Sequence, residues 1–179
     1  MNWEYAILIV LLVITMLALR RIGARRGEDT RAARMMKEYK VMTRDKLEAA
    51  PEGELVDAVV CRVLARAEDS RRPDPVTVLA DLQHGSTVVY TVWVACKEMA
   101  TGDFAALMHS RSKDVAALAA DGFDAIGAAA CAAAWRVLLA GAEDVPAAEK
   151  AFREAVGAEQ PLALCEGYIR DHAEEFIDE

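Results

Sequence analysis

The stretch LVDAVVCRVL, residues 55–64, decides the fold class of this chain. Its apolar residues recur at the spacing that places them on one face of a helix: Leu55, Val56, Val59, Val60, Val63 and Leu64. Pro51, just before it, suits the first position of a helix, and the SRRPDP run at residues 70–75 ends it because two prolines interrupt helical hydrogen bonding. We therefore predict an amphipathic helix that opens a helical body.

The chain after residue 75 divides into further helical segments at glycine, proline and cap residues. The β-branched run at residues 88–92 is also compatible with a strand, but no alternating partner strand occurs elsewhere, so we favour a helix. The expected segments are 76–82, a helix capped by Ser86 or Thr87, 104–108, 113–120 with Gly122 as its C-cap, 125–140, 146–156 ended by Gly157, and 161–177. The predicted fold is all-α, a compact bundle of six to eight short helices.

Charge is distributed unevenly along the chain. The 179 residues carry 21 Lys and Arg against 29 Asp and Glu, yet residues 1–27 have a net charge of +3, residues 28–50 of +1 and residues 51–179 of −12. The negative sign argues against a basic nucleic-acid-binding protein, so we expect no direct contact with nucleic acid. Four cysteines are too few for a disulfide-stabilised scaffold of this length.

The N-terminal segment YAILIVLLVITMLAL, residues 5–19, is uncharged, and arginines follow it. We predict that residues 1–27 form a single transmembrane helix with a basic flank, with the N-terminus outside and the C-terminal domain in the cytoplasm. A cleaved signal peptide and a buried core helix are the alternatives. The expected anchor residues are Trp3, Tyr5, Leu11, Leu12, Arg20 and Arg21.

Residues 28–50 are charged on most faces and lack a broad apolar stripe. We predict a solvated helical stalk that links the anchor to an acidic helical domain at residues 51–179. Met35, Met36, Tyr39 and Met42 recur at roughly helical spacing, so a partner-binding amphipathic helix is the alternative.

No motif of catalysis or metal binding is present in the sequence. Cys61, Cys96, Cys131 and Cys165 are spaced by 35, 35 and 34 residues, but their flanking residues do not repeat, and we expect free buried thiols. The three histidines form no metal-binding pair, and the glycines are too isolated to cradle a phosphate. We therefore predict no catalytic, cofactor or metal residues. An enzyme, in which His84, His109 or a cysteine converges with carboxylates, is the less favoured alternative.

Several segments of the body resemble a known family. They are VVYTVW at 88–93, Glu98-Met99, Gly102-Asp103-Phe104, AIGA at 125–128 and the closing YIRDH at 168–172 through Phe176, with LVDAV at 55–59 as the opening helix. Together, over about residues 52–177, they resemble the helical bacterial domain family typified by a DNA-mimic protein. The chain departs from the family motif Asn-Asn-Gly-Gly, in place of which it has Ala100-Thr101-Gly102-Asp103, and from the glutamine that follows the phenylalanine.

The resemblance implies a helical fold and an acidic face that imitates DNA phosphates to occupy a DNA-binding protein. We accordingly predict a membrane-tethered, cytosol-facing, non-enzymatic module that binds a protein partner with a basic surface. An immunity-type or scaffold protein that binds through an apolar groove is the alternative. The candidate partner-binding residues are Asp103, Asp114, Asp121, Asp124, Asp171, Glu174 and Glu175.

Overall fold

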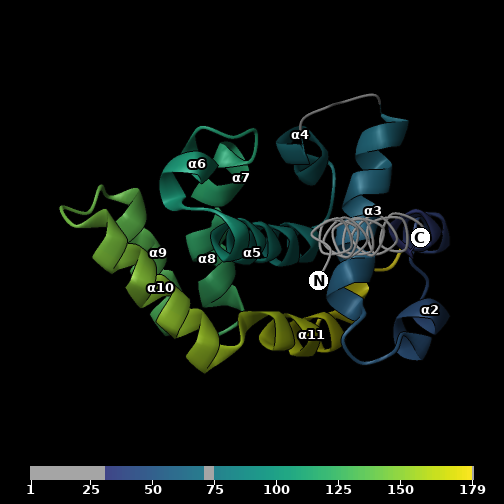
Figure 1. The fold of residues 1–179 in the computed structure, drawn as a ribbon. Coiled ribbons are helices and arrows are strands. Elements are labelled where there is room, and N and C mark those ends of the chain that lie inside the picture. The colour runs from purple at the N-terminus through teal and green to yellow at the C-terminus, as the bar shows by residue number, and fades with distance from the viewer. Residues whose placement is uncertain (1–30, 71–74, 179) are drawn as a thin grey trace, which may run out of the picture.

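The computed structural model describes residues 31–70 and 75–178, and every regular element in that part of the chain is a helix (Figure 1). Residues 31–38 are helical. The elements that follow are α2 (Arg44–Ala49), α3 (Leu55–Asp69), α4 (Pro75–Ala80), α5 (His84–Thr101), α6 (Phe104–Met108), α7 (Lys113–Ala117), α8 (Ala119–Ala125), α9 (Ala129–Leu139), α10 (Val145–Glu159), α11 (Pro161–Asp171) and a 3₁₀ turn (Ala173–Glu175). The all-α prediction is confirmed, although the described part of the body has nine α-helices, α3 to α11, where six to eight were expected.

The central element is α5, which packs against α3, α4, α6, α7, α8, α10 and α11. Its 18 residues are apolar along most of their length, and Val89, Val92 and Ala95 are completely buried. A helix surrounded by others in this way needs no polar face, which explains why its sequence is also compatible with a strand. The preference for a helix at residues 88–92 is confirmed.

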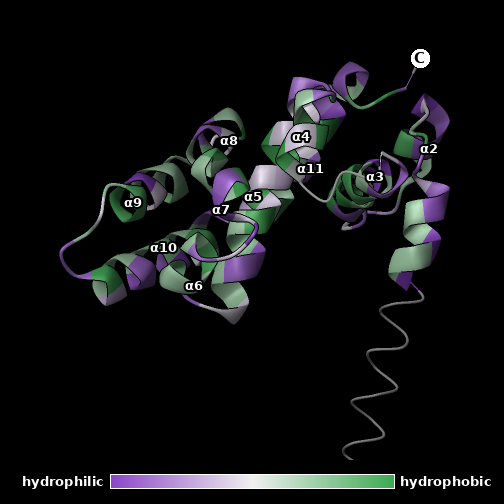
Figure 2. Ribbon diagram, turned by 90° about the horizontal axis from the view of Figure 1, so that it is seen from above, coloured by the Kyte–Doolittle hydropathy of each residue, from purple (hydrophilic) through white to green (hydrophobic). Residues whose placement is uncertain are grey.

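One end of the bundle is an α9–α10 hairpin packed on α8, while α2 and α3 lie at the opposite end in both views (Figures 1 and 2). The core of the end formed by α8, α9 and α10 is aromatic: the Trp135 ring contacts Phe104, Phe123 and Phe152. The buried Trp135 indole donates a hydrogen bond to the carbonyl of Ala116 at 2.9 Å. Figure 2 shows hydrophobic and hydrophilic residues alternating around α9 and α10, as expected for helices with one buried side.

Residues 31–50 pack on the body, contrary to the expected solvated stalk. Met35, Tyr39, Met42 and Leu47 are all at most 5% exposed and belong to the same hydrophobic core as α3 and α5. Arg31 Nη2 lies 2.9 Å from the carboxylate of Glu54 at the start of α3. The helical spacing of Met35, Tyr39 and Met42 therefore indicates the face of this segment that is buried against the body. The division of the chain at residues 27 and 50 stays a prediction.

Several helix boundaries differ from those expected. Gly122, predicted to be a C-cap, lies inside α8, and the segment 113–120 is divided at Leu118 into α7 and α8. The expected 125–140 helix begins only at Ala129. Helix α10 continues past Gly157 to Glu159 and ends at Gln160, which adopts the left-handed conformation with φ 49°.

The predicted membrane localisation is corrected. Within residues 31–70 and 75–178, no helix combines the length and the apolar character needed to cross a membrane. The anchor residues Trp3, Tyr5, Leu11, Leu12, Arg20 and Arg21 lie outside the described residues. The structure therefore gives no support for a single-pass membrane protein.

Candidate functional site

Two of the predicted partner-binding carboxylates cap helices. Asp103 accepts a hydrogen bond from the backbone N–H of Ala106 at 2.7 Å and so caps the first turn of α6. Glu175 accepts one from the backbone N–H of Gly85 at 2.7 Å, across 90 residues of sequence, and so satisfies the N-terminus of α5. Both carboxylates therefore have a structural role within the chain.

Three more of the predicted carboxylates form intramolecular ion pairs. Arg136 of α9 pairs with Asp124 and lies 3.7 Å from Asp121. The hydrogen bond from Arg136 holds the pKa of the Asp124 carboxyl below its usual value, although partial desolvation opposes this shift. Glu174 pairs with Arg44 of α2. These contacts use part of the negative charge that a partner would otherwise meet.

The remaining two, Asp114 at the start of α7 and Asp171 at the end of α11, are exposed and form no ion pair or side-chain hydrogen bond with another described residue. The seven residues thus come from four different elements and one connecting turn rather than from one helix face. Their role in partner binding stays a prediction.

Other carboxylates are exposed or half-buried and form no ion pair or side-chain hydrogen bond within the described ranges. They are Glu38, Asp45, Glu48, Glu52, Glu68, Glu98, Glu143 and Glu166. The sequence offered no way to distinguish these acids from the paired ones, because most of the pairs join residues far apart in the chain. They are the carboxylates whose charge remains fully available to a binding partner.

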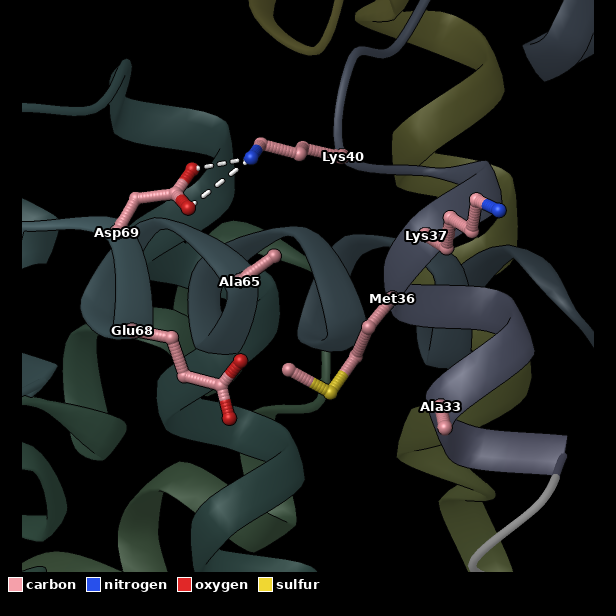
Figure 3. Close-up of a pocket in the computed structure, with 7 residues that line it drawn as sticks. All are labelled: Ala33, Met36, Lys37, Lys40, Ala65, Glu68 and Asp69. Carbon is pink, nitrogen blue, oxygen red and sulfur yellow. Dashed lines mark hydrogen bonds and ion pairs between the residues drawn. The ribbon is translucent and has the colours of Figure 1, made fainter.

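A first pocket, of about 330 Å³, lies between the 31–38 helix and α3. Its lining residues are Ala33, Met36, Lys37, Lys40, Ala65, Glu68 and Asp69 (Figure 3). Figure 3 shows the Met36 side chain pointing toward α3, and Lys40 paired with Asp69 at 2.7 Å. Two lysines and two carboxylates balance in charge, so this pocket does not select an ion of either sign.

A second pocket, of about 310 Å³, lies where the start of α3 meets α5 and α11, and we refer to it as the α3–α5–α11 pocket. It is lined by Glu52, Gly53, Val56, Asp57, Trp93, Leu162, Ala163 and Glu166. All of its ionisable residues are acids. This pocket could not be predicted from the sequence, because its residues come from three separated segments.

The side chain of Asp178, near the end of the described chain, forms contacts with Met42 and with α3. The Asp178 carboxylate accepts hydrogen bonds from the backbone N–H of Met42 at 2.8 Å, from Arg62 at 2.5 Å and from Arg66 at 2.8 Å. Burial alone would raise the pKa of this carboxyl, but these hydrogen bonds and the two guanidinium charges together hold it below its usual value. The sequence reasoning did not identify Asp178 or Arg62.

The thiols and histidines form no metal-binding group among the described residues. Cys61, Cys131 and Cys165 are buried and Cys96 is partly buried, all four as free thiols. Burial raises the pKa of Cys96 and of Cys165 to about 12, which leaves little reactive thiolate. The three histidines are exposed. Across the described ranges, no group of three or more His, Cys, Asp or Glu is arranged to hold a metal ion.

In comparisons with known proteins, residues 80–179 match the model of a family described as DMP19-like protein. No curated protein and no solved structure matches the chain. The matched segment runs from the last residue of α4 through α11 and includes Trp93, Leu162 and Glu166 of the α3–α5–α11 pocket, whereas Glu52 and Asp57 precede it.

Proposed function

The chain belongs to the DMP19-like protein family, which points to a DNA-mimic helical protein-interaction module, and on that premise we propose that it binds the basic surface of a partner protein. The partner is a protein whose cationic surface otherwise meets nucleic acid. The carboxylates of this chain take the place of phosphates there.

The observation that carries this proposal is the charge of the family-matched segment. Residues 80–179 contain 17 Asp and Glu against seven Lys and Arg, a net charge of −10, whereas the whole chain has −8. Duplex DNA is likewise a dense array of negative charge, with one phosphate per ~1.7 Å of helix axis. A basic surface selected to meet such an array is attracted to any comparably charged one.

The exposure of the carboxylates supports the same function. Asp121 is 89% exposed, and the Arg136 guanidinium balances only one of the two carboxylates beside it. Asp114, Glu143 and Asp171 are exposed and form no ion pair or side-chain hydrogen bond in the described part of the chain. We therefore retain Asp103, Asp114, Asp121, Asp124, Asp171, Glu174 and Glu175 as proposed partner-binding residues, with Asp114, Asp121 and Asp171 as those least engaged within the fold.

The family is not a known enzyme family. That this chain has no catalytic activity of its own is part of the proposal. It is supported by buried thiols of raised pKa, which are poor nucleophiles.

The full chain, immobilised on a support, tests the proposal. We expect it to retain DNA-binding proteins from a bacterial lysate at about 50 mM salt and to release them by about 200 mM, because exposed charge pairs are screened by salt. Free duplex DNA added at low salt should displace the same proteins. Retention that is indifferent to both salt and DNA would contradict the proposal and favour binding through apolar contacts.

Charge variants test directly whether the acidic surface determines partner binding. The triple variant Asp114→Asn, Asp121→Asn and Asp171→Asn removes three exposed charges without removing a helix cap, and we expect its partners to elute at lower salt. The oppositely directed control, Lys113→Gln with Lys150→Gln, makes the chain more acidic and should shift elution to higher salt. Identical elution of all three proteins would show that the acidic surface does not determine binding.

A further inference from the structure

We propose that the α3–α5–α11 pocket holds an arginine side chain of the partner protein. This inference rests on the proposed function and deepens it, because it names the part of the surface that would recognise a specific cation of the partner. Three features of the pocket support it: the apolar wall, the carboxylate rim and the environment of Trp93.

The wall of the pocket is apolar and partly open. Val56 is 5% exposed and forms part of the buried core, whereas Leu162 is 40% exposed at the start of α11. Trp93 of α5 is half-buried between them. The aliphatic stem of a long basic side chain buries apolar surface when it lies along such a wall.

The rim of the pocket is negative. Glu52 and Glu166 form no ion pair or side-chain hydrogen bond with another described residue. Asp57 lies 3.8 Å from Arg31 Nη2 and remains 45% exposed. A cation entering the pocket therefore meets up to three carboxylates, two near the start of α3 and one on α11. The same rim repels phosphate, which excludes nucleic acid and anionic lipid as occupants.

Trp93 adds an aromatic surface to this environment. Lys97 of the same helix places its Nζ 5.7 Å from the centroid of the Trp93 ring, so the ring already has a cation beside it. Trp135 donates its indole N–H to a carbonyl, but Trp93 forms no hydrogen bond through its indole with another described residue. The Trp93 ring also stacks with Tyr90, with 6.0 Å between the ring centroids. Trp93 nevertheless lines the pocket, so its indole signal reports what enters there.

The size and chemistry of the pocket favour arginine as the occupant. Its volume, about 310 Å³, is at the lower end of the range for ligand pockets, which suits one long side chain rather than a whole helix. Guanidinium is planar, stacks on aromatic rings and forms paired hydrogen bonds with carboxylates. Lysine provides a point charge without the planar stacking surface. Arginine therefore matches the carboxylate rim, with which it can form paired hydrogen bonds.

Nuclear magnetic resonance of the full chain with ¹⁵N-labelled tryptophan tests the proposal. The probe is the blocked tripeptide acetyl-Ala-Arg-Ala-amide, and its matched control carries citrulline, which has nearly the same shape and no charge. We expect the arginine peptide to shift the indole signal of Trp93 and to leave that of the buried Trp135 in place. The citrulline peptide should shift neither signal.

Rim variants complete the experiment. Glu52→Gln or Glu166→Gln should weaken the apparent affinity of the arginine peptide by roughly two- to fivefold, as expected for loss of one partly exposed charge pair. Glu143→Gln is the control, because it removes an equally negative side chain from the α9–α10 loop at the other end of the bundle. An unchanged Trp135 signal in each variant shows that the fold is intact.

Three outcomes overturn the pocket assignment: no shift at Trp93, an equal shift with both peptides, or the same loss of affinity in all three variants. Failure of this inference is separate from failure of the proposed function. If DNA displaces captured proteins while Trp93 does not respond, the function stands and the pocket does not. If Trp93 responds selectively while captured proteins are indifferent to DNA and salt, the pocket stands and DNA mimicry does not.

Discussion

At the scale of single residues, the most constrained charge in the structure is that of Arg62. Its side chain is 4% exposed within α3, and it reaches Ser86 Oγ at 3.2 Å and Asp178 at 2.5 Å, while its Nε finds no acceptor among the described residues. A buried guanidinium with one incomplete hydrogen-bond position depends strongly on its counter-ion. Asp178 therefore stabilises the fold chiefly by neutralising Arg62.

Replacing this carboxylate tests that dependence. Asp178→Asn removes the negative charge and leaves Arg62 buried without a counter-ion, so we expect the free energy of unfolding to fall by about 2–4 kcal/mol in urea denaturation at neutral pH. Asp171→Asn, which alters an exposed carboxylate with no ion pair among the described residues, is the control and should change it by less than about 0.5 kcal/mol. Equal effects of the two substitutions would show that the contact between Asp178 and Arg62 contributes nothing to the free energy of unfolding.

Acid should weaken the same contact. Because the pKa of Asp178 is lower in the folded chain than in the unfolded chain, its stabilising contribution is complete above about pH 4 and disappears as the pH falls through the folded value. Thermal unfolding of the full chain between pH 7 and pH 3 should therefore show a loss of stability at the acid end. The Asp178→Asn variant should lose less over the same interval, since it has no carboxylate to protonate.

At the scale of helices, the contact between α5 and α8 requires a residue without a side chain. A Cβ at Gly122 would lie 2.7 Å from Thr91 Oγ1, closer than Cβ atoms pack, and 3.1 Å from the carbonyl of Val88, which is a tight contact. Glycine inside a helix costs stability relative to alanine. It is retained here because it permits the close approach of two buried helices.

A pair of glycine substitutions separates these two effects. Gly122→Ala should destabilise the fold by about 1–3 kcal/mol, because the added methyl group overpacks the α5–α8 interface. Gly167→Ala in α11, where a Cβ has no neighbour within 4 Å, should stabilise it by about 0.5–1 kcal/mol. Urea denaturation of both variants measures the contrast. Stabilisation by both would show that α8 does not pack closely on α5.

The helices that could be predicted from sequence are those whose signals are local. The stripe at residues 55–64, the proline that opens α11 and the apolar run of α5 all produced correct helices. The boundaries that differed are set by distant residues. Ser86 or Thr87 was expected to cap α5, but the helix begins at His84, and Glu175 caps it from 90 positions away. Likewise Glu159 of α10 caps the start of α9 through the N–H groups of Ala130 and Cys131.

At the scale of the whole molecule, the family-matched segment shares its core with residues that precede it. Leu55, Val59 and Val63 of α3 are completely buried, and α3 packs against both α5 and α11. The acidic character of the segment could be read from the sequence, but which carboxylates are engaged, and that an acidic pocket lies beside Trp93, could not. Both depend on segments that approach one another only in the folded chain.

Removing the preceding residues should therefore disrupt the fold. We expect the fragment 80–179 to expose the apolar surface of α5 that α3 covers, to leave Asp178 without Arg62 and to lose cooperative thermal unfolding. Circular dichroism and binding of a hydrophobic dye, compared with the full chain, measure this. A sharp transition within about 5 °C of that of the full chain would contradict the prediction.

The position of Arg136 between Asp121 and Asp124 has a consequence for how such a protein diverges. One substitution at this arginine removes the cation beside both acids, so the net negative charge of this surface rises by one without any new Asp or Glu. If the proposed function holds, the placement of the few basic residues in related sequences is a better guide to partner binding than the number of their acids.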